Sequence, residues 1–185
     1  MRIVGGELGG RRISAPRGAA TRPTPERARE ALFNILGPLE GLDVLDLFAG
    51  SGALGLEALS RGARSATFVE LGAPAVRALR ENLDRLDLGG RARVLKLDWR
   101  RALRAEADGG RLYGVAVVDP PYAVTASIAP HLASILGPVL APGARVVLEH
   151  SSAAPVDLLS GFGAVSVRRY GNTAISIGRT ASSDV

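Results

Sequence analysis

The sequence predicts an α/β fold built on a doubly wound, mainly parallel sheet of seven strands, with a small N-terminal hairpin and helix in front of it. Apolar strand candidates alternate with helical stretches from residue 43 to residue 149. Some of these strands, such as residues 115–118, are apolar throughout, which is typical of parallel strands covered on both faces. A chain of 185 residues is long enough for one such core.

The first 38 residues are expected to form an extension. Short apolar segments on either side of the glycine-rich stretch 5–10 predict a small hairpin. Residues 15–24 are rich in Pro and Arg and are expected to be a linker. Thr24 as N-cap and Pro25 as first helical residue predict a helix that ends at Gly37.

The main domain is expected to span residues 39–179. Strands are predicted at residues 43–48, 65–70, 92–97, 113–118, 143–149, 164–168 and 173–178. Helices are predicted near residues 53–61, 73–86, 99–106 and 127–137. The last two strands flank Gly171-Asn172 and are expected to pair as an antiparallel hairpin, and residues 180–185 are expected to be a disordered tail.

The composition excludes several chemistries. The chain has no cysteine, so disulfides, thiolate zinc sites, iron–sulfur clusters and cysteine nucleophiles are ruled out. Its two histidines, His131 and His150, are far apart in sequence, and no metal site is expected. The start lacks the apolar run of a signal peptide, and no segment is long and apolar enough to span a membrane. We therefore expect a cytoplasmic protein.

The positive charge is concentrated near the N-terminus. Residues 1–29 hold seven arginines against Glu7 and Glu26, whereas the other 156 residues carry 16 basic and 16 acidic side chains. Such a basic segment indicates a polyanionic partner, because arginine suits bidentate phosphate contacts. The alternative is a solvated segment without a partner.

The first chemical motif is a glycine-rich turn after the strand at 43–48. Gly50, Gly52 and Gly55 match the dinucleotide-binding fingerprint, and Glu70 lies 20 residues after Gly50, where it can accept from both ribose hydroxyls. A side chain at Gly50 or Gly52 would occupy the space that a ligand needs. The motif does not separate NAD from S-adenosylmethionine, and it also fits a plain tight turn.

Asp46 adds information at the end of the same strand. Its carboxylate would repel a pyrophosphate, yet it can accept from the ammonium group of S-adenosylmethionine, directly or through water. A structural hydrogen bond is the alternative role.

The second motif is Asp119-Pro120-Pro121-Tyr122, directly after an apolar strand. The two prolines fix the backbone, so the Asp119 carboxylate and the Pro120 carbonyl can be held as two acceptors for one NH₂ group. Tyr122 can stack on an extruded base. The motif therefore favours methylation of a nucleobase amine, and a Pro-Pro loop with a capping Asp is the alternative.

These features together resemble the bacterial family of class I S-adenosylmethionine-dependent methyltransferases that methylate guanine N2 in 16S ribosomal RNA. The resemblance rests on Arg2-Ile3-Val4-Gly5-Gly6, Arg22-Pro23-Thr24, Arg29-Glu30 with Phe33-Asn34, residues 46–52, residues 119–122 and Tyr170-Gly171-Asn172-Thr173. It runs from residue 2 to about residue 178, and the N-terminal hairpin with Arg22-Pro23-Thr24 is its narrower marker.

The resemblance implies roles for individual residues. The cofactor S-adenosylmethionine would be bound by Asp46, Phe48, Gly50, Gly52, Glu70, Leu71, Asp98 and Trp99. The catalytic residues toward guanine would be Asp119, Pro120 and Tyr122, and the RNA-binding residues Arg2, Arg11, Arg12 and Arg22. From the residues alone, Asp98 fits a helix cap equally well, and Arg22 and Thr24 could contact either cofactor or RNA.

The implied function is methyl transfer to the exocyclic N2 of a guanine in 16S rRNA, with the assembled or assembling small subunit as partner and the protein as a monomer. Adenine-N6 or cytosine-N4 methylation of nucleic acid is the second enzymatic interpretation. An NAD-dependent dehydrogenase explains the glycines and Glu70 but neither the Pro-Pro motif nor the basic segment. A non-catalytic RNA-binding module explains only the basic segment.

Overall fold

The computed structural model describes residues 1–16, 26–153, 159 and 161–182. The description also leaves out the side chains at positions 122–124, 126, 127, 129, 130 and 164. The predictions made for Arg22, Thr24, Pro25 and residues 183–185 fall on residues outside the described ranges. The chain forms two compact units, Met1–Trp99 and Arg100–Val185, and each is described by itself.

The first unit holds three parallel strands in the order β3-β2-β1. These are β1 (Asp43–Leu47), β2 (Ser65–Val69) and β3 (Ala92–Leu95), and the helices are α1 (Glu26–Leu36), α2 (Ala53–Ser60), α3 (Ala73–Leu86) and the short η1 (Gly89–Arg91). In β1 and β2 the last four residues are buried. All three strands therefore end at one edge, where the segments after β1, β2 and β3 meet.

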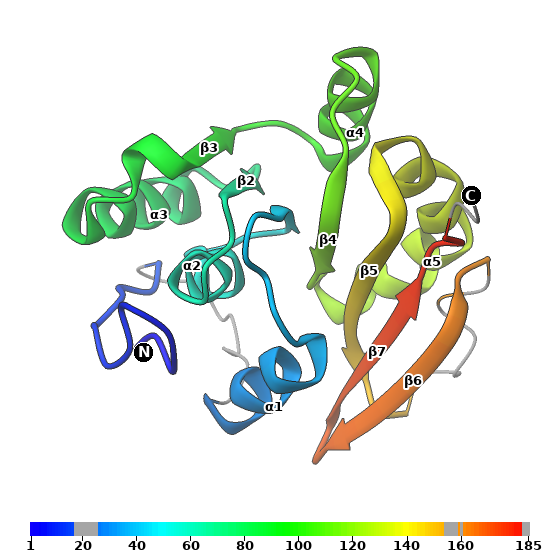
Figure 1. The fold of residues 1–185 in the computed structure, drawn as a ribbon, viewed down its shortest axis with the longest axis horizontal. Helices are drawn as coiled ribbons and strands as arrows, with labels where there is room; N and C mark the ends of the chain where they lie inside the picture. The colour runs from blue at the N-terminus through cyan, green and yellow to red at the C-terminus, as the bar shows by residue number, and fades with distance from the viewer. Residues whose placement is uncertain (17–25, 154–158, 160, 183–185) are drawn as a thin grey trace. The chain divides into compact units, whose positions relative to one another are not determined.

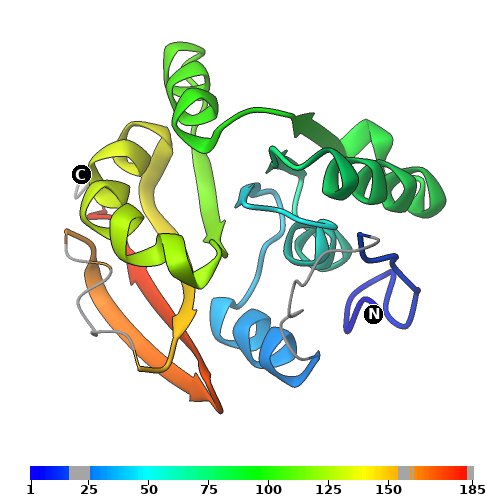
Figure 2. The same ribbon diagram turned by 180° about the vertical axis from the view of Figure 1, so that it is seen from behind.

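The N-terminal hairpin packs on this unit. Arg2 and Arg12 form an antiparallel bridge, and Ile3 and Ile13 are buried. The hairpin lies beside α2 in both ribbon views (Figure 1, Figure 2). The predicted hairpin is confirmed, and its two isoleucines contribute to the core of the first unit.

The second unit orders its strands β4-β5-β7-β6. It comprises β4 (Tyr113–Val118), β5 (Leu140–Ser151), β6 (Gly163–Tyr170) and β7 (Thr173–Arg179), with α5 (Tyr122–Leu136), η2 (Gly137–Val139) and most of α4 (Trp99–Asp108). β4 and β5 are parallel, whereas β7 runs antiparallel to both β5 and β6. Helix α5 lies over one face of these strands (Figure 2).

The predicted fold class is confirmed: helices join mainly parallel strands, and the chain closes with the antiparallel hairpin. Several boundaries differ, those of β3 and β5 most clearly. β5 begins at Leu140 instead of residue 143, and Leu140 pairs with Tyr113 of β4. β3 ends at Leu95 instead of residue 97, because its partner β2 ends at Val69 and offers no further pairing. β5 extends to Ser151 because β7 pairs with it along that length.

Helix α5 also begins five residues earlier than predicted, at Tyr122. The β-branched Val124 and Thr125 disfavour a helix by propensity, which obscured its start. Pro121 at the N-cap fixes the backbone there. Within the described part of the chain, no helix is long and apolar enough to cross a bilayer.

Candidate functional site

The glycine-rich turn leaves β1 with an unusual backbone. Phe48 has a φ of 63°, a left-handed conformation that a bulky side chain rarely adopts, and Gly50 has a φ of 56°. The Gly50 N–H donates to Glu70 Oε2 at 2.9 Å. A Cβ at Gly50 would meet no atom within 4 Å, so the space beside this glycine is open. This fits the expectation that a ligand approaches the backbone at Gly50.

Gly52 is required for a different reason than expected. Its φ is 83°, and a Cβ there would lie 2.4 Å from Leu79 Cδ1 and 3.3 Å from Phe68 Cε1. The close approach at this position is therefore to the core of the first unit. A side chain at Gly55 would likewise meet Phe68 Cε1 at 2.3 Å.

Asp46 is almost fully buried, with 1% of its surface exposed. Its Oδ2 accepts from the Gly55 N–H at 2.8 Å, so it holds the first turn of α2 to the end of β1. Burial raises the pKa of Asp46 to about 7; the Gly55 hydrogen bond opposes this rise and the charge of Glu70 adds to it. Asp46 therefore forms the structural hydrogen bond that was the alternative to a role in ligand binding.

The raised pKa makes stability depend on pH. An unfolded aspartate titrates near pH 4, so the contribution of Asp46 is full below that pH and is lost as the pH rises through about 7. We expect Asp46→Asn, whose amide oxygen can still accept from Gly55, to remove this dependence. In urea unfolding, the stability of wild type relative to Asp46→Asn should fall by a few kcal/mol between pH 5 and pH 8. An equal difference at both pH values would contradict the raised pKa.

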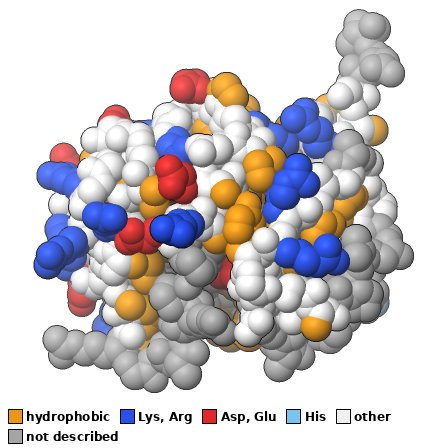
Figure 3. Space-filling view, turned by 90° about the horizontal axis from the view of Figure 1, so that it is seen from below, with side chains coloured by type: hydrophobic (Ala, Val, Ile, Leu, Met, Phe, Trp, Pro, Cys, Tyr) orange, Lys and Arg blue, Asp and Glu red, His pale blue; other side chains and the backbone are white. Residues whose placement is uncertain are grey.

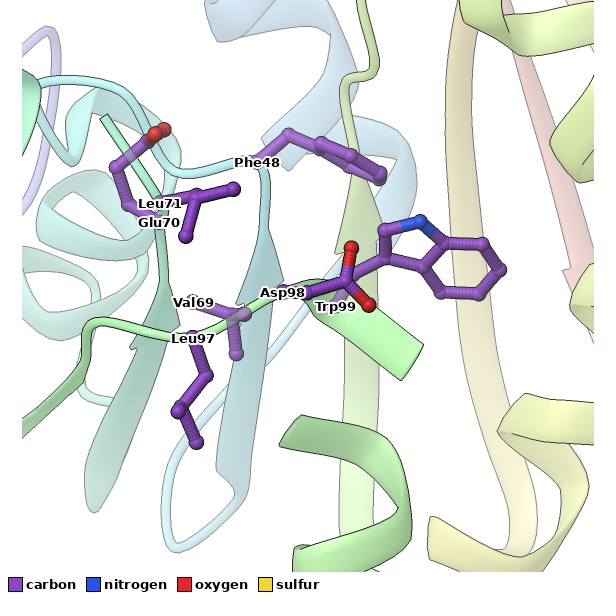
Figure 4. A pocket seen from close by; sticks show the side chains of 7 residues that line it. All are labelled: Phe48, Val69, Glu70, Leu71, Leu97, Asp98 and Trp99. Carbon is purple, nitrogen blue, oxygen red and sulfur yellow. The ribbon is translucent and has the colours of Figure 1, made fainter. Parts of the chain in front are cut away.

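A pocket opens at the carboxyl ends of β1, β2 and β3. It is lined by Phe48, Val69, Glu70, Leu71, Leu97, Asp98 and Trp99. The Phe48 and Trp99 rings lie 6.2 Å apart between centroids at an interplanar angle of 47°. Figure 4 shows Leu71 between Glu70 and this aromatic pair. Leu71 is 61% exposed, which is unusual for a leucine and gives the pocket an apolar surface open to a ligand.

Glu70 is fixed by two backbone donors. Besides the bond from Gly50, its Oε1 accepts from the Gly72 N–H at 2.6 Å. A carboxylate has about four acceptor positions, so two remain for a ligand diol. Asp98 follows β3 at the far side of the same pocket. Five of the residues predicted to bind the cofactor line this one pocket: Phe48, Glu70, Leu71, Asp98 and Trp99.

In the second unit, Asp119 directly follows β4 and is half-buried, and Pro120 is buried. Pro121 is the N-cap of α5, with φ −52° and ψ 134°, and its carbonyl accepts from Thr125 Oγ1 at 3.4 Å. The motif thus stands between a buried strand and a helix start, which holds its backbone in one conformation. Tyr122 is the first residue of α5.

The basic residues of the hairpin are at the surface. Arg11 and Arg12 are exposed. Arg2 is exposed as well, but its Nε is 3.0 Å from Glu26 Oε2, so part of its charge is already paired.

Sequence reasoning missed two buried polar residues that hold the hairpin. The Glu57 carboxylate accepts from the Val4 and Gly5 N–H groups at 2.7 and 2.8 Å. Asn82 Oδ1 accepts from the Ser14 N–H, and its Nδ2 donates to the Ser14 carbonyl. The available signal was a single glutamate in the otherwise apolar helix at 53–59.

Known proteins resemble the chain along most of its length. Ribosomal RNA small subunit methyltransferase D of Escherichia coli strain K12 is 43% identical over 123 residues, 66% of this chain and 60% of that protein, so the match spans less than two thirds of the relative. A hypothetical protein of Thermus thermophilus has a TM-score of 0.83 at 37% identity, covering 96% of this chain and 98% of that one. An RNA methyltransferase from Salinibacter ruber, solved with S-adenosyl-L-homocysteine, has a TM-score of 0.63 at 17% identity over 89% and 96% of the chains, which concerns the fold alone.

The fold, with its pocket at the carboxyl ends of the first three strands, is that of the class I S-adenosylmethionine-dependent methyltransferases, and the Escherichia coli relative at 43% identity is also named a methyltransferase. The chain belongs to the family described as conserved hypothetical protein 95, which matches residues 1–179. The resemblance drawn from the motifs is confirmed at the level of this family.

Proposed function

We propose that the protein transfers a methyl group from S-adenosylmethionine to the exocyclic N2 of a guanine in 16S ribosomal RNA. The observation that carries the choice of an amine is the position of Asp119, directly after β4 and before two prolines and the start of α5. The name of the Escherichia coli relative supports ribosomal RNA of the small subunit as the substrate class.

The pocket fits the cofactor. Glu70 has acceptor positions left for the ribose hydroxyls, and Asp98 can accept from the adenine amine beside the Trp99 ring. Leu71 offers an apolar surface to the base. Asp46 and the Gly50–Gly52 backbone hold the methionine end, with Asp46 acting in part through the turn that it fixes.

The chemistry at the target is set by positioning. Bound S-adenosylmethionine supplies an electrophilic methyl group. Asp119 and the Pro120 carbonyl accept the two N–H groups of the guanine amine, which favours a pyramidal nitrogen with its lone pair free to form the new N–C bond. Asp119 is also the residue that can take the proton that the nitrogen loses. Tyr122 stacks on the extruded base.

The RNA is held by the N-terminal hairpin. Arg2, Arg11, Arg12 and Arg22 neutralise phosphates of the 16S rRNA, within the assembled or assembling small subunit. The hydrogen bonds that the hairpin backbone donates to Glu57 hold the hairpin, which carries Arg2, Arg11 and Arg12, against α2. The protein acts as a monomer.

The decisive experiment identifies the product nucleoside. Small subunits from a strain lacking this protein are incubated with the enzyme and labelled S-adenosylmethionine, and the rRNA is digested and analysed by mass spectrometry. The expected product is N2-methylguanosine. If the product is N6-methyladenosine or N4-methylcytidine, the guanine assignment is wrong and the second enzymatic interpretation is correct. A methyl group on a ribose oxygen or a ring carbon would overturn both interpretations.

Cofactor binding is tested by calorimetry. Glu70→Gln removes the charge that accepts from the ribose and should weaken S-adenosylmethionine binding by roughly 10- to 100-fold, since hydrogen bonds to a charged group contribute about 1.5–3 kcal/mol. Glu81→Gln, on the exposed side of α3, is the matched control and should bind as wild type does. NAD should not bind. If Glu70→Gln and Glu81→Gln bind S-adenosylmethionine with equal affinity, Glu70 does not accept from the ribose hydroxyls.

A further inference from the structure

The end of β6 carries a second basic surface that the proposed function does not use. Arg168 and Arg169 are exposed, and Tyr170 is half-buried directly before the turn at Gly171. Among the described strands β6 is the outermost of its unit and has only β7 as neighbour. We call residues 168–170 the β6 end.

The β6 end lies in line with Asp119 across the sheet of the second unit. The pairing runs Val118↔Leu148, Leu148↔Ser176 and Ser176↔Val167. β4 and β6 run in the same direction. Arg168, the residue after Val167, and Asp119, the residue after Val118, therefore lie at the same edge of the sheet. With strands about 4.8 Å apart, three steps place the Arg168 backbone roughly 14 Å from that of Asp119, at the same edge.

The chain around the β6 end is mostly basic, and the acidic residue in register with it, Glu149 of β5, is 6% exposed and lies two strands from Arg168. Between Asp157 and Asp184 the sequence has no acidic residue but three arginines. Among the described residues, the right-hand part of the face in the space-filling view shows basic and apolar side chains (Figure 3). Positive side chains on an outer strand also prevent strands of other chains from pairing with it, which is the structural alternative.

We propose that the β6 end binds the single-stranded RNA that adjoins the target nucleotide, with Arg168 and Arg169 on phosphates and Tyr170 against a base. This proposal rests on the proposed function. Extruding a base for methylation unstacks its neighbours. Along β6 the side chains alternate, so Arg168 and Tyr170 lie on one face and Arg169 on the other, and a single strand that crosses the outer edge of β6 meets all three. The distance from Asp119 corresponds to nucleotides close to the target and not to the target itself.

The test measures RNA affinity against salt concentration. The probe is a single-stranded RNA oligonucleotide, and affinity is measured for wild type and for the double variant Arg168→Ala/Arg169→Ala. Each phosphate contact on a single strand contributes about 0.7 to the slope of log affinity against log salt, so the slope should fall by roughly 1.4. Arg179→Ala, an exposed arginine at the other end of the same hairpin, is the matched control and should keep the wild-type slope.

Tyr170 gives an independent readout. Tyr170→Ala should weaken binding by about fivefold or more through lost stacking, whereas Tyr170→Phe should restore it because the ring remains. Thermal unfolding of each variant shows whether the fold is kept, and calorimetry with S-adenosylmethionine should give the wild-type affinity.

The double variant Arg11→Ala/Arg12→Ala separates the two ways of failing. If that variant lowers the slope and Arg168→Ala/Arg169→Ala leaves it unchanged, the β6 end is an edge-protecting strand and the inference is wrong, while the proposed function stands. If wild type itself does not bind RNA, the proposed function fails and the inference fails with it.

Discussion

Asp119→Ala is expected to bind S-adenosylmethionine as wild type does and to transfer its methyl group about 100- to 1,000-fold more slowly. In the proposed mechanism the Asp119 carboxylate accepts from the target amine only when the substrate is in place. Its loss should therefore remove transition-state stabilisation of about 3–4 kcal/mol and leave cofactor binding unchanged. The pocket residues all belong to the first unit, whereas Asp119 follows β4 of the second. The measurement is single-turnover methyl transfer to small subunits.

Two variants sharpen this result. Asp119→Asn keeps an acceptor oxygen and should retain more activity than Asp119→Ala. Asp108→Ala removes an exposed carboxylate at the end of α4 and should transfer methyl at the wild-type rate. Near-normal transfer by Asp119→Ala would show that the amine is not held at this motif.

Glu57→Ala should be the most destabilising of the substitutions considered, costing about 3–5 kcal/mol of unfolding free energy. The side chain is fully buried and accepts from Val4 N–H, Gly5 N–H and Arg61 Nε. Arg29, which is 1% exposed, lies 3.8 Å away through its Nη1, and burial lowers the pKa of Arg29 while the charge of Glu57 opposes this. Removing Glu57 leaves the buried Arg29 cation without its counter-charge and two part-buried N–H groups without their acceptor.

Urea unfolding measures this cost, with Glu30→Ala on the exposed side of α1 as control, expected within about 0.5 kcal/mol of wild type. Hydrogen exchange at the Val4 and Gly5 amides gives a local readout and should be faster in Glu57→Gln as well. If Glu57→Ala unfolds at the wild-type urea concentration, the carboxylate does not hold the hairpin.

Periodicity and turn residues were enough to predict every strand and main helix outside residues 17–25, because the buried strands are nearly continuous in apolar residues. The strand boundaries that were predicted wrongly depend on the neighbouring strands in the sheet. β3 is limited by where β2 ends, and the length of β5 is set by β7, a strand some 25 residues later in the chain. Such limits come from tertiary pairing, which local sequence does not contain.

Five residues that line the pocket could be named from the sequence because they follow strand ends at the spacing of a known motif. Residue types alone did not reveal what fills the space beside Gly52, since Leu79 comes from a helix 27 residues further on. The roles of Glu57 and Asn82 were not predicted for a similar reason: each side chain forms hydrogen bonds with backbone atoms more than 50 residues away in the sequence. A sequence motif predicts which residues contact a ligand, but it does not predict which residues elsewhere in the chain hold the motif in its conformation.

The way the hairpin is held also sets an order for folding during synthesis. The partners of residues 4, 5 and 14 are Glu57 and Asn82, 52 to 68 residues further along the chain. Residues 1–14 are made before α2 and α3 exist, so on the ribosome residues 4 and 5 have no acceptor until Glu57 has emerged, and residue 14 has none until Asn82 has emerged. At about 5–20 residues per second, the hairpin is therefore without its complete set of partners for several seconds.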